Sequence, residues 1–210
     1  MKQKPPQTLT IEECDTLLSH LQNYPRGFAR KPWVIRNTCM ALVMLDAGLR
    51  VSEVIGIQRG DLCWTDQIVS SIRVQARIAK RGSGRLVPVT TRLTAALELM
   101  QLNIWSPRST QQDQTAFFNL MTGHALAKQS VGRIIRNAGR LSLHRDIHPH
   151  MLRHTFATNL MQTTNARVVQ QLLGHKNLSS TQIYMHRTSR ISEKPLTVCR
   201  RETKFAQCDM

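Results

Sequence analysis

Apolar side chains recur at helical spacing along most of the chain. Near the N-terminus, Thr10 and Glu13 have the spacing of a capping box, and Leu17, Leu18 and Leu21 form an apolar face behind it. This pattern predicts a first helix that starts near Thr10. Further helices are expected over residues 33–47, from residue 51 or 52 to about 57, and over residues 91–102, 130–138, 149–161, 166–173 and from 181 into the 180s.

One stretch alternates instead, with the period of a strand. Ile72, Val74, Ala76 and Ile78 are separated by single residues that are mostly polar. A glycine-containing turn over residues 81–84 follows this strand region, which covers residues 68–78, and a second strand is expected over 86–89. The pattern predicts a mainly α domain with a small antiparallel β-sheet, an α+β fold.

The length and composition favour one folded domain. The chain has 210 residues, 41% of them hydrophobic, which suffices for one core. We expect a flexible arm over residues 1–8, a domain over 9–188 and a tail over 189–210.

The start MKQKPPQTLTIEE lacks the apolar core of a signal peptide, and the longest apolar run, residues 39–45, is too short to span a bilayer. Five cysteines without a CxxC spacing favour a reducing, cytoplasmic setting over a disulfide framework or a zinc knuckle.

Charge narrows the choice of partner. Lys and Arg number 29 against 13 Asp and Glu, for a net charge of +16 and an isoelectric point near 10.8. Residues 67–97 and 147–192 contain no acidic residue. The strand-like alternation of the first window does not fit a basic amphipathic membrane helix. We therefore expect DNA or RNA as the partner, with an ordinary solvated basic face as the alternative.

Two short segments in the first half of the chain carry candidate chemistry. In AGLRVSEV, Arg50 and Glu53 stand three residues apart and share a helix face. A surface ion pair is the simpler interpretation of that spacing. Lys80 opens the glycine-rich turn between the two strands, where a lysine either reaches a neighbouring site as a mobile point charge or only solubilises the turn.

A third segment, HPHMLRHT, begins a predicted helix. Pro149 suits the first helical position, and His150 and Arg153 then share a face beside a helix N-terminus, which favours anions. His150 and His154 also have the i, i+4 spacing of metal ligands, but no carboxylate stands between them and no Cys or acidic residue is near. We favour phosphate over metal and expect no cofactor.

A fourth segment, LLGHK, precedes one of only two tyrosines in the chain. Tyr24 lies beside a proline at a predicted helix end and is most simply structural, whereas Tyr184 lies in an acid-free segment that stabilises a phenolate. Together the four segments offer two arginines, a lysine, two histidines and a tyrosine. Such a set suits phosphoryl transfer, because guanidinium groups neutralise phosphate oxygens and a hydroxyl supplies the nucleophile.

In this order the four segments resemble the boxes of the tyrosine recombinase (phage integrase) family. AGLRVSEVIGIQRGDL is similar to its first arginine box, KRGSGRLVPV to its hairpin, HPHMLRHTFATNL to its HxxR box and LLGHKNLSSTQIYMH to its closing box. The match covers about residues 9–187. The resemblance implies the catalytic-domain fold of DNA breaking–rejoining enzymes. Short members resembling fimbrial-switch invertases lack the additional DNA-clamping domain that most members carry, and with only about eight residues before the first predicted helix we expect the same here.

The resemblance assigns three residues to the phosphate and a fourth to their support. Arg50 and Arg153 would clamp the scissile phosphate, and His175 would hydrogen-bond it. Glu53 would be a supporting residue that orients the site.

The resemblance assigns three further residues to the chemical step. Tyr184 would attack and form a 3′-phosphotyrosyl link, Lys80 would protonate the leaving 5′ oxygen, and His150 would assist proton transfer with the tyrosine. Neither ATP nor a metal is implied. The candidate DNA contacts are other basic residues of the two acid-free windows: Arg73, Arg77, Arg81, Arg85, Lys176 and Arg187.

The implied activity is site-specific recombination or integration of double-stranded DNA, as in mobile elements. The resemblance also implies a homotetramer on synapsed DNA sites, with the tail over 189–210 docking on a neighbouring protomer; the free state, a monomer included, stays open. Such a protein is expected at the nucleoid. Two alternatives remain: a recombinase-like protein that binds DNA without cleaving it, and a relaxing enzyme of the type IB topoisomerase kind.

Overall fold

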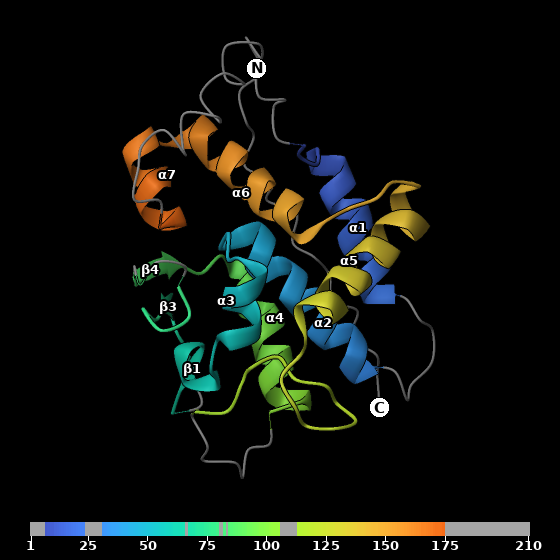
Figure 1. Cartoon of the computed structure of the whole chain (residues 1–210), viewed down its shortest axis with the longest axis vertical. Coiled ribbons are helices and arrows are strands. Elements are labelled where there is room, and N and C mark those ends of the chain that lie inside the picture. Colours follow the sequence, from blue (N-terminus) through green and yellow to red (C-terminus); the bar gives the residue numbers. More distant parts are fainter. Residues whose placement is uncertain are drawn as a thin grey trace.

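The computed structural model describes residues 7–23, 31–65, 67–79, 82, 84–105 and 113–174. In this part of the chain, helices surround one central helix and two short hairpins lie at one side (Figure 1). The predicted α+β class with little sheet is confirmed. The helices are α1 (Ile11–Asn23), α2 (Lys31–Asp46), α3 (Val51–Gly56), α4 (Thr91–Asn103), α5 (Lys128–Leu143), α6 (Pro149–Thr163), α7 (Ala166–Leu173) and the 3-10 turn η2 (Arg59–Asp61).

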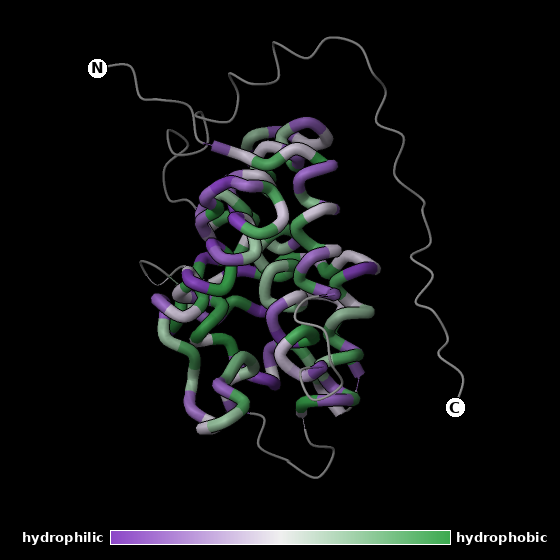
Figure 2. The backbone as a smooth tube through the Cα atoms, turned by 90° about the vertical axis from the view of Figure 1, so that its right-hand side faces the viewer, coloured by the Kyte–Doolittle hydropathy of each residue, from purple (hydrophilic) through white to green (hydrophobic). Residues whose placement is uncertain are grey.

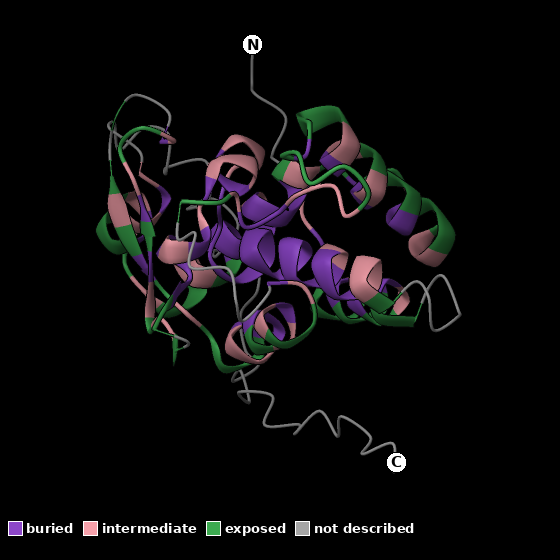
Figure 3. Ribbon diagram, turned by 90° about the horizontal axis from the view of Figure 1, so that it is seen from below, coloured by how far each residue is buried: buried purple, intermediate pink, exposed green. Residues whose placement is uncertain are grey.

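Helix α2 forms the centre of the core. Almost all of its side chains from residue 35 onward are buried, and Figure 3 shows it enclosed by elements with exposed outer faces. Helices α1, α4 and α6 pack against it. The apolar run over residues 39–45 explains this position, because a helix that is apolar on all sides is stable only when neighbours cover it. The peripheral helices instead show alternating hydrophobic and hydrophilic stretches (Figure 2).

Helix α1 begins with the predicted capping box. The backbone amide of Thr10 donates to Glu13 Oε2 at 2.8 Å, and the amide of Glu13 donates to Thr10 Oγ1 at 3.2 Å. The remaining oxygen of Glu13 accepts a hydrogen bond from Arg145 Nη1 at 2.8 Å. This ion pair joins α1 to the segment after α5, and the two helices lie side by side (Figure 1).

The strands form two separate antiparallel hairpins. β1 (Cys63–Trp64) pairs with β2 (Gln67–Ile68), and β3 (Ser71–Val74) pairs with β4 (Arg85–Pro88). The predicted strand region over 68–78 is too long. It stops at Val74 because the amides of Ile78 and Ala79 both donate to the Gln75 carbonyl and close a turn.

Helices α6 and α7 enclose a second, smaller apolar cluster. It contains Phe156, Ala157, Val169 and Leu173. The predicted range of α7 is confirmed, whereas α5 extends beyond the predicted 130–138 at both ends. Helix α7 ends at Gly174 in the left-handed conformation, with φ +62°, close to β4.

Two further expectations concern membranes and thiols. In the described part of the chain, no helix combines the length and hydropathy needed to cross a bilayer. Cys14, Cys39 and Cys63 are free and buried, and burial raises the pKa of the Cys14 thiol to about 12. The predicted tail over 189–210 and the helix expected from residue 181 lie outside the described residues.

Candidate functional site

Arg50 and Glu53 form a buried pair at the start of α3. Glu53 Oε2 accepts a hydrogen bond from the Arg50 backbone amide at 2.7 Å, and Oε1 accepts one from Arg50 Nη1 at 2.9 Å. The Glu53 side chain has 0% relative exposure and that of Arg50 has 16%. The pair is therefore not an ordinary surface ion pair. A carboxylate buried this completely stays charged only if it is paired and hydrogen-bonded.

Arg85, from β4, binds the same carboxylate. Its Nη1 donates to Glu53 Oε1 at 2.9 Å and its Nη2 donates to Oε2 at 2.8 Å, while its Nε donates to the Leu172 carbonyl at 2.6 Å. The Arg85 side chain is only 4% exposed. The sequence predicts a DNA contact for Arg85. In the structure, its buried guanidinium group instead binds the carboxylate of Glu53.

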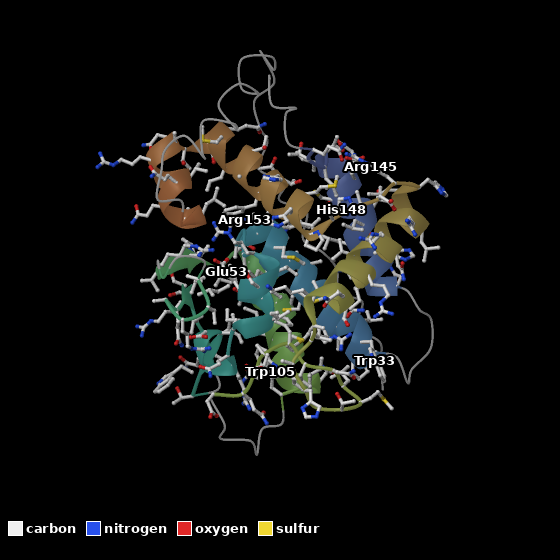
Figure 4. The ribbon with its side chains drawn as sticks, in the orientation of Figure 1. Trp33, Glu53, Trp105, Arg145, His148 and Arg153 are labelled. Carbon is white, nitrogen blue, oxygen red and sulfur yellow. The ribbon has the colours of Figure 1, made fainter. Side chains whose placement is uncertain are left out.

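Arg153, from α6, completes the group. Its Nη1 donates to the carbonyl of Gly48, just before Arg50, and its Nη2 donates to the Leu173 carbonyl at 2.7 Å. Its side chain is 5% exposed, and Nη1 lies 3.8 Å from Glu53 Oε2. Figure 4 shows Glu53 and Arg153 close together between α3, α6 and α7. The structure thus brings together the two arginines that the sequence predicts to share a phosphate.

The balance of charge in this group is positive. Three guanidinium groups surround one carboxylate, which leaves two positive charges unbalanced among these four residues. Burial raises the pKa of Glu53, but hydrogen bonds and charge from Arg85, the Arg50 amide and the charge of Arg153 outweigh it, so the pKa lies below its usual value. Glu53 therefore stays ionised at neutral pH and holds the arginines, while the excess charge favours an anion.

Two histidines lie beside Arg153 on the first turns of α6. Pro149 occupies the first turn as predicted, His150 is exposed, and the His150 and His154 ring centroids are 6.4 Å apart. Burial, then the nearby charges of His150 and Arg153, lower the pKa of His154 to about 4. His154 is therefore neutral at pH 7. Among the described residues, no three His, Cys, Asp or Glu side chains gather as a metal site.

Exposed basic side chains lie on two other elements. On the β3 side, Arg73 and Arg77 are exposed, and Arg77 Nη2 lies 3.9 Å from Asp61. Helix α5 exposes four more, which the sequence reasoning missed: Lys128, Arg133, Arg136 and Arg140, of which Arg140 pairs with Asp146. A signal for them exists, because residues 114–145 form a third window without Asp or Glu.

Six of the predicted site residues lie outside the described part of the chain. They belong to the β3–β4 turn or follow α7: Lys80, Arg81, His175, Lys176, Tyr184 and Arg187. Their roles stay predictions. The described residues just before them, Leu173 and Gly174, do lie at the arginine group.

Comparisons with known proteins identify relatives of this chain. The chain is 32% identical over 185 residues to "Tyrosine recombinase XerD" of Halalkalibacterium halodurans, covering 87% of this chain and 58% of the relative. It is 38% identical over 158 residues to "Tyrosine recombinase XerC" of Haemophilus ducreyi, covering 74% and 49%. The chain thus spans about half the length of these curated relatives, 58% of one and 49% of the other.

Solved structures share the fold. The crystal structure of XerA recombinase has a TM-score of 0.70 at 23% identity, covering 92% of this chain and 66% of that one. A post-cleavage complex of XerH site-specific recombinase with its difH substrate has a TM-score of 0.69 at 22% identity, covering 88% and 50%. The family model of the phage integrase family matches residues 7–190, nearly the whole chain. The arginine group lies within the matched residues, and the chain belongs to the phage integrase family.

Proposed function

We propose that this protein cleaves and rejoins double-stranded DNA at specific sites through a covalent 3′-phosphotyrosyl intermediate. The observation that carries the proposal is the convergence of Arg50 and Arg153, from opposite halves of the chain, on the buried carboxylate of Glu53. Two rigidly held guanidinium groups beside an excess of positive charge suit the non-bridging oxygens of one backbone phosphate.

In the proposed first step, Tyr184 Oη attacks the phosphorus and the bond from phosphorus to the 5′ oxygen breaks. His150 assists removal of the phenol proton, and Lys80 gives a proton to the leaving 5′ oxygen. Arg50 and Arg153 neutralise charge on the non-bridging oxygens as the transition state forms. Attack by a 5′-hydroxyl on the phosphotyrosyl bond then rejoins a strand. Each step exchanges one phosphoester for another of similar energy, so the proposal needs neither ATP nor a metal.

The DNA-binding surface in this proposal includes the β3 side and α5. Arg73 and Arg77 are exposed there, and α5 adds its own exposed basic side chains. We propose that Arg81, Lys176 and Arg187 also contact DNA, from their positions in the two windows of the sequence without acidic residues. Such a surface binds the phosphate backbone and leaves the target sequence to base contacts and DNA shape.

The active form is proposed to contain several copies of this chain. We propose residues 9–188 as the catalytic domain and a homotetramer on synapsed sites as the working form, with the segment over 189–210 docking on a neighbour. A monomer is the proposed free state, and the nucleoid is the proposed location.

The test is trapping of the covalent intermediate. Purified protein is incubated with a pool of duplexes that carry a nick near a randomised core, so that the short cleaved fragment diffuses away and cannot be rejoined. We expect an adduct that survives denaturant, disappears with protease and forms equally well in the presence of a chelator. Tyr184→Phe should bind the pool without forming an adduct, and Tyr24→Phe, at the only other tyrosine, should form it normally.

The alternatives give different results in this assay or in a plasmid relaxation assay. Binding without any adduct would support a protein that only occupies DNA. Relaxation of any supercoiled plasmid regardless of sequence would support a topoisomerase-like activity. An adduct that survives Tyr184→Phe would overturn the assignment of the nucleophile.

A further inference from the structure

Arg85 connects Glu53 to the end of α7 through hydrogen bonds. Its three guanidinium nitrogens all donate: Nη1 and Nη2 to the two oxygens of Glu53, and Nε to the carbonyl of Leu172. The side chain is 4% exposed, and all three of its guanidinium nitrogens are engaged by protein acceptors. A guanidinium used in this way acts on other residues rather than on DNA.

We propose that Arg85 is a positioning residue that holds Glu53, and through it Arg50 and Arg153, in place at the site of the scissile phosphate. This inference rests on the proposed strand cleavage, in which those two arginines hold the phosphate. It assigns Arg85 no contact with DNA and no share in proton transfer.

The accounting of hydrogen bonds at Glu53 supports the proposal. A carboxylate has about four acceptor positions. Arg85 fills two of them, and the backbone amide and Nη1 of Arg50 fill the other two. Arg153 Nη1 therefore remains 3.8 Å from Oε2, beyond hydrogen-bond distance. Without Arg85, two positions on a buried carboxylate become vacant, and Arg50 or Arg153 is drawn into them and away from a phosphate.

The end of α7 supplies the second line of support. The last carbonyls of a helix lack partners within the helix. At the end of α7, Arg85 binds the Leu172 carbonyl at 2.6 Å and Arg153 binds the next one, Leu173, at 2.7 Å. A Cβ on Gly174 would lie 3.3 Å from Arg85 Cδ, so the chain passes close over this side chain. Arg85 thereby helps to set the direction in which the chain leaves α7 toward His175.

Lysine is the informative replacement. Arg85→Lys keeps the positive charge, but a single ammonium cannot fork both oxygens of Glu53 and also reach the Leu172 carbonyl. The control is Arg92→Lys, because Arg92 makes a forked pair with a different carboxylate, that of Asp46, through Nε at 2.7 Å and Nη2 at 2.5 Å, and its side chain is 49% exposed. The two variants separate loss of position from loss of a forked ion pair in general.

The first readout uses the nicked duplex pool. If wild-type protein forms the adduct and Tyr184→Phe does not, the proposed function holds. Arg85→Lys should then form the adduct about 100-fold more slowly, the scale expected for a misplaced catalytic group. Its DNA affinity should match that of Arg92→Lys, while its thermal midpoint should be lower, because the Arg85 side chain is 4% exposed and that of Arg92 is 49% exposed. An adduct rate equal to that of Arg92→Lys would overturn the inference while leaving the proposed function intact.

The second readout needs no DNA. Hydrogen–deuterium exchange of the free protein should speed up in the peptide that contains α7 (Ala166–Leu173) for Arg85→Lys, and remain unchanged there for Arg92→Lys. Unchanged exchange in that peptide would overturn the inference even if no cleavable DNA site were found.

Discussion

The guanidinium of Arg153 donates a hydrogen bond to the carbonyl of Gly48, the residue at which the chain turns out of α2 toward Arg50. Gly48 has φ +61°, and a Cβ at this position would overlap the ring of Phe156. One turn therefore fixes the position of both arginines, which makes Gly48 sensitive for stability and for the site.

Gly48→Ala should lower the free energy of unfolding by about 2–4 kcal/mol, from left-handed strain of about 1 kcal/mol plus overpacking against Phe156. Urea denaturation measures the change. Gly132→Ala on α5 is the control, because a Cβ there meets nothing within 4 Å. That variant should be up to about 1 kcal/mol more stable, since alanine favours the helix. Equal stabilities for the two variants would count against the described turn.

Glu53→Gln should be among the most destabilising conservative changes in the chain. It removes the charge that pairs with Arg50 and Arg85 and lies 3.8 Å from Arg153, at a cost of about 3–5 kcal/mol near neutral pH. Because the pKa of Glu53 is lowered on folding, its contribution is present above the usual carboxylate pKa and is lost as pH falls through the lowered value. Wild type and variant should therefore converge in acid.

The exposed Glu98, on α4, provides the control for that measurement. Glu98→Gln should stay within about 0.5 kcal/mol of wild type, as is usual for surface positions. A Glu53→Gln protein as stable as Glu98→Gln at neutral pH would show that the buried carboxylate does not hold the arginines.

His154 should make the fold sensitive to mild acid. Its pKa falls from 6.5 to about 4 on folding, so the unfolded chain binds the proton first as pH drops. Wild-type stability should decline between about pH 6.5 and 4, by about 2 kcal/mol relative to His154→Gln after allowance for partial exposure. Chemical denaturation at several pH values tests this, with the exposed His124→Gln as control. Parallel curves for wild type and His154→Gln would refute it.

DNA binding should weaken steeply with salt. Each phosphate contact contributes a slope of about −0.9 to the plot of log affinity against log salt. Arg73→Gln, on the exposed side of β3, should reduce the size of the slope by about 1. Arg140→Gln is the control, because that exposed arginine already pairs with Asp146 at 2.5 Å. A flat salt response in wild type would contradict the proposed basic surface.

Local signals predicted most of the helical framework. The capping box at Thr10 and Glu13, the apolar run inside α2 and Pro149 at the start of α6 are each determined by residues close in sequence. The spacing of Arg50 and Glu53 also predicted their contact, although not its complete burial.

Long-range contacts limited the rest. The sequence predicted a surface DNA contact for Arg85. Its partners in the structure are a carboxylate on α3 and a carbonyl on α7, and the residues near Arg85 in the sequence indicate neither. The strand expected to reach residue 78 stops early because the backbone amides of Ile78 and Ala79 donate to the Gln75 carbonyl. The alternation of apolar and polar side chains does not predict this turn.

The most direct test of the central claim is to identify the amino acid that carries the DNA. The trapped adduct is digested with protease and nuclease, and the remaining nucleotide is located on its peptide by mass spectrometry. We predict a phosphate that joins the Tyr184 hydroxyl to the 3′ end of the cleaved strand. A nucleotide attached to any other residue, or through its 5′ end, would contradict the proposed mechanism.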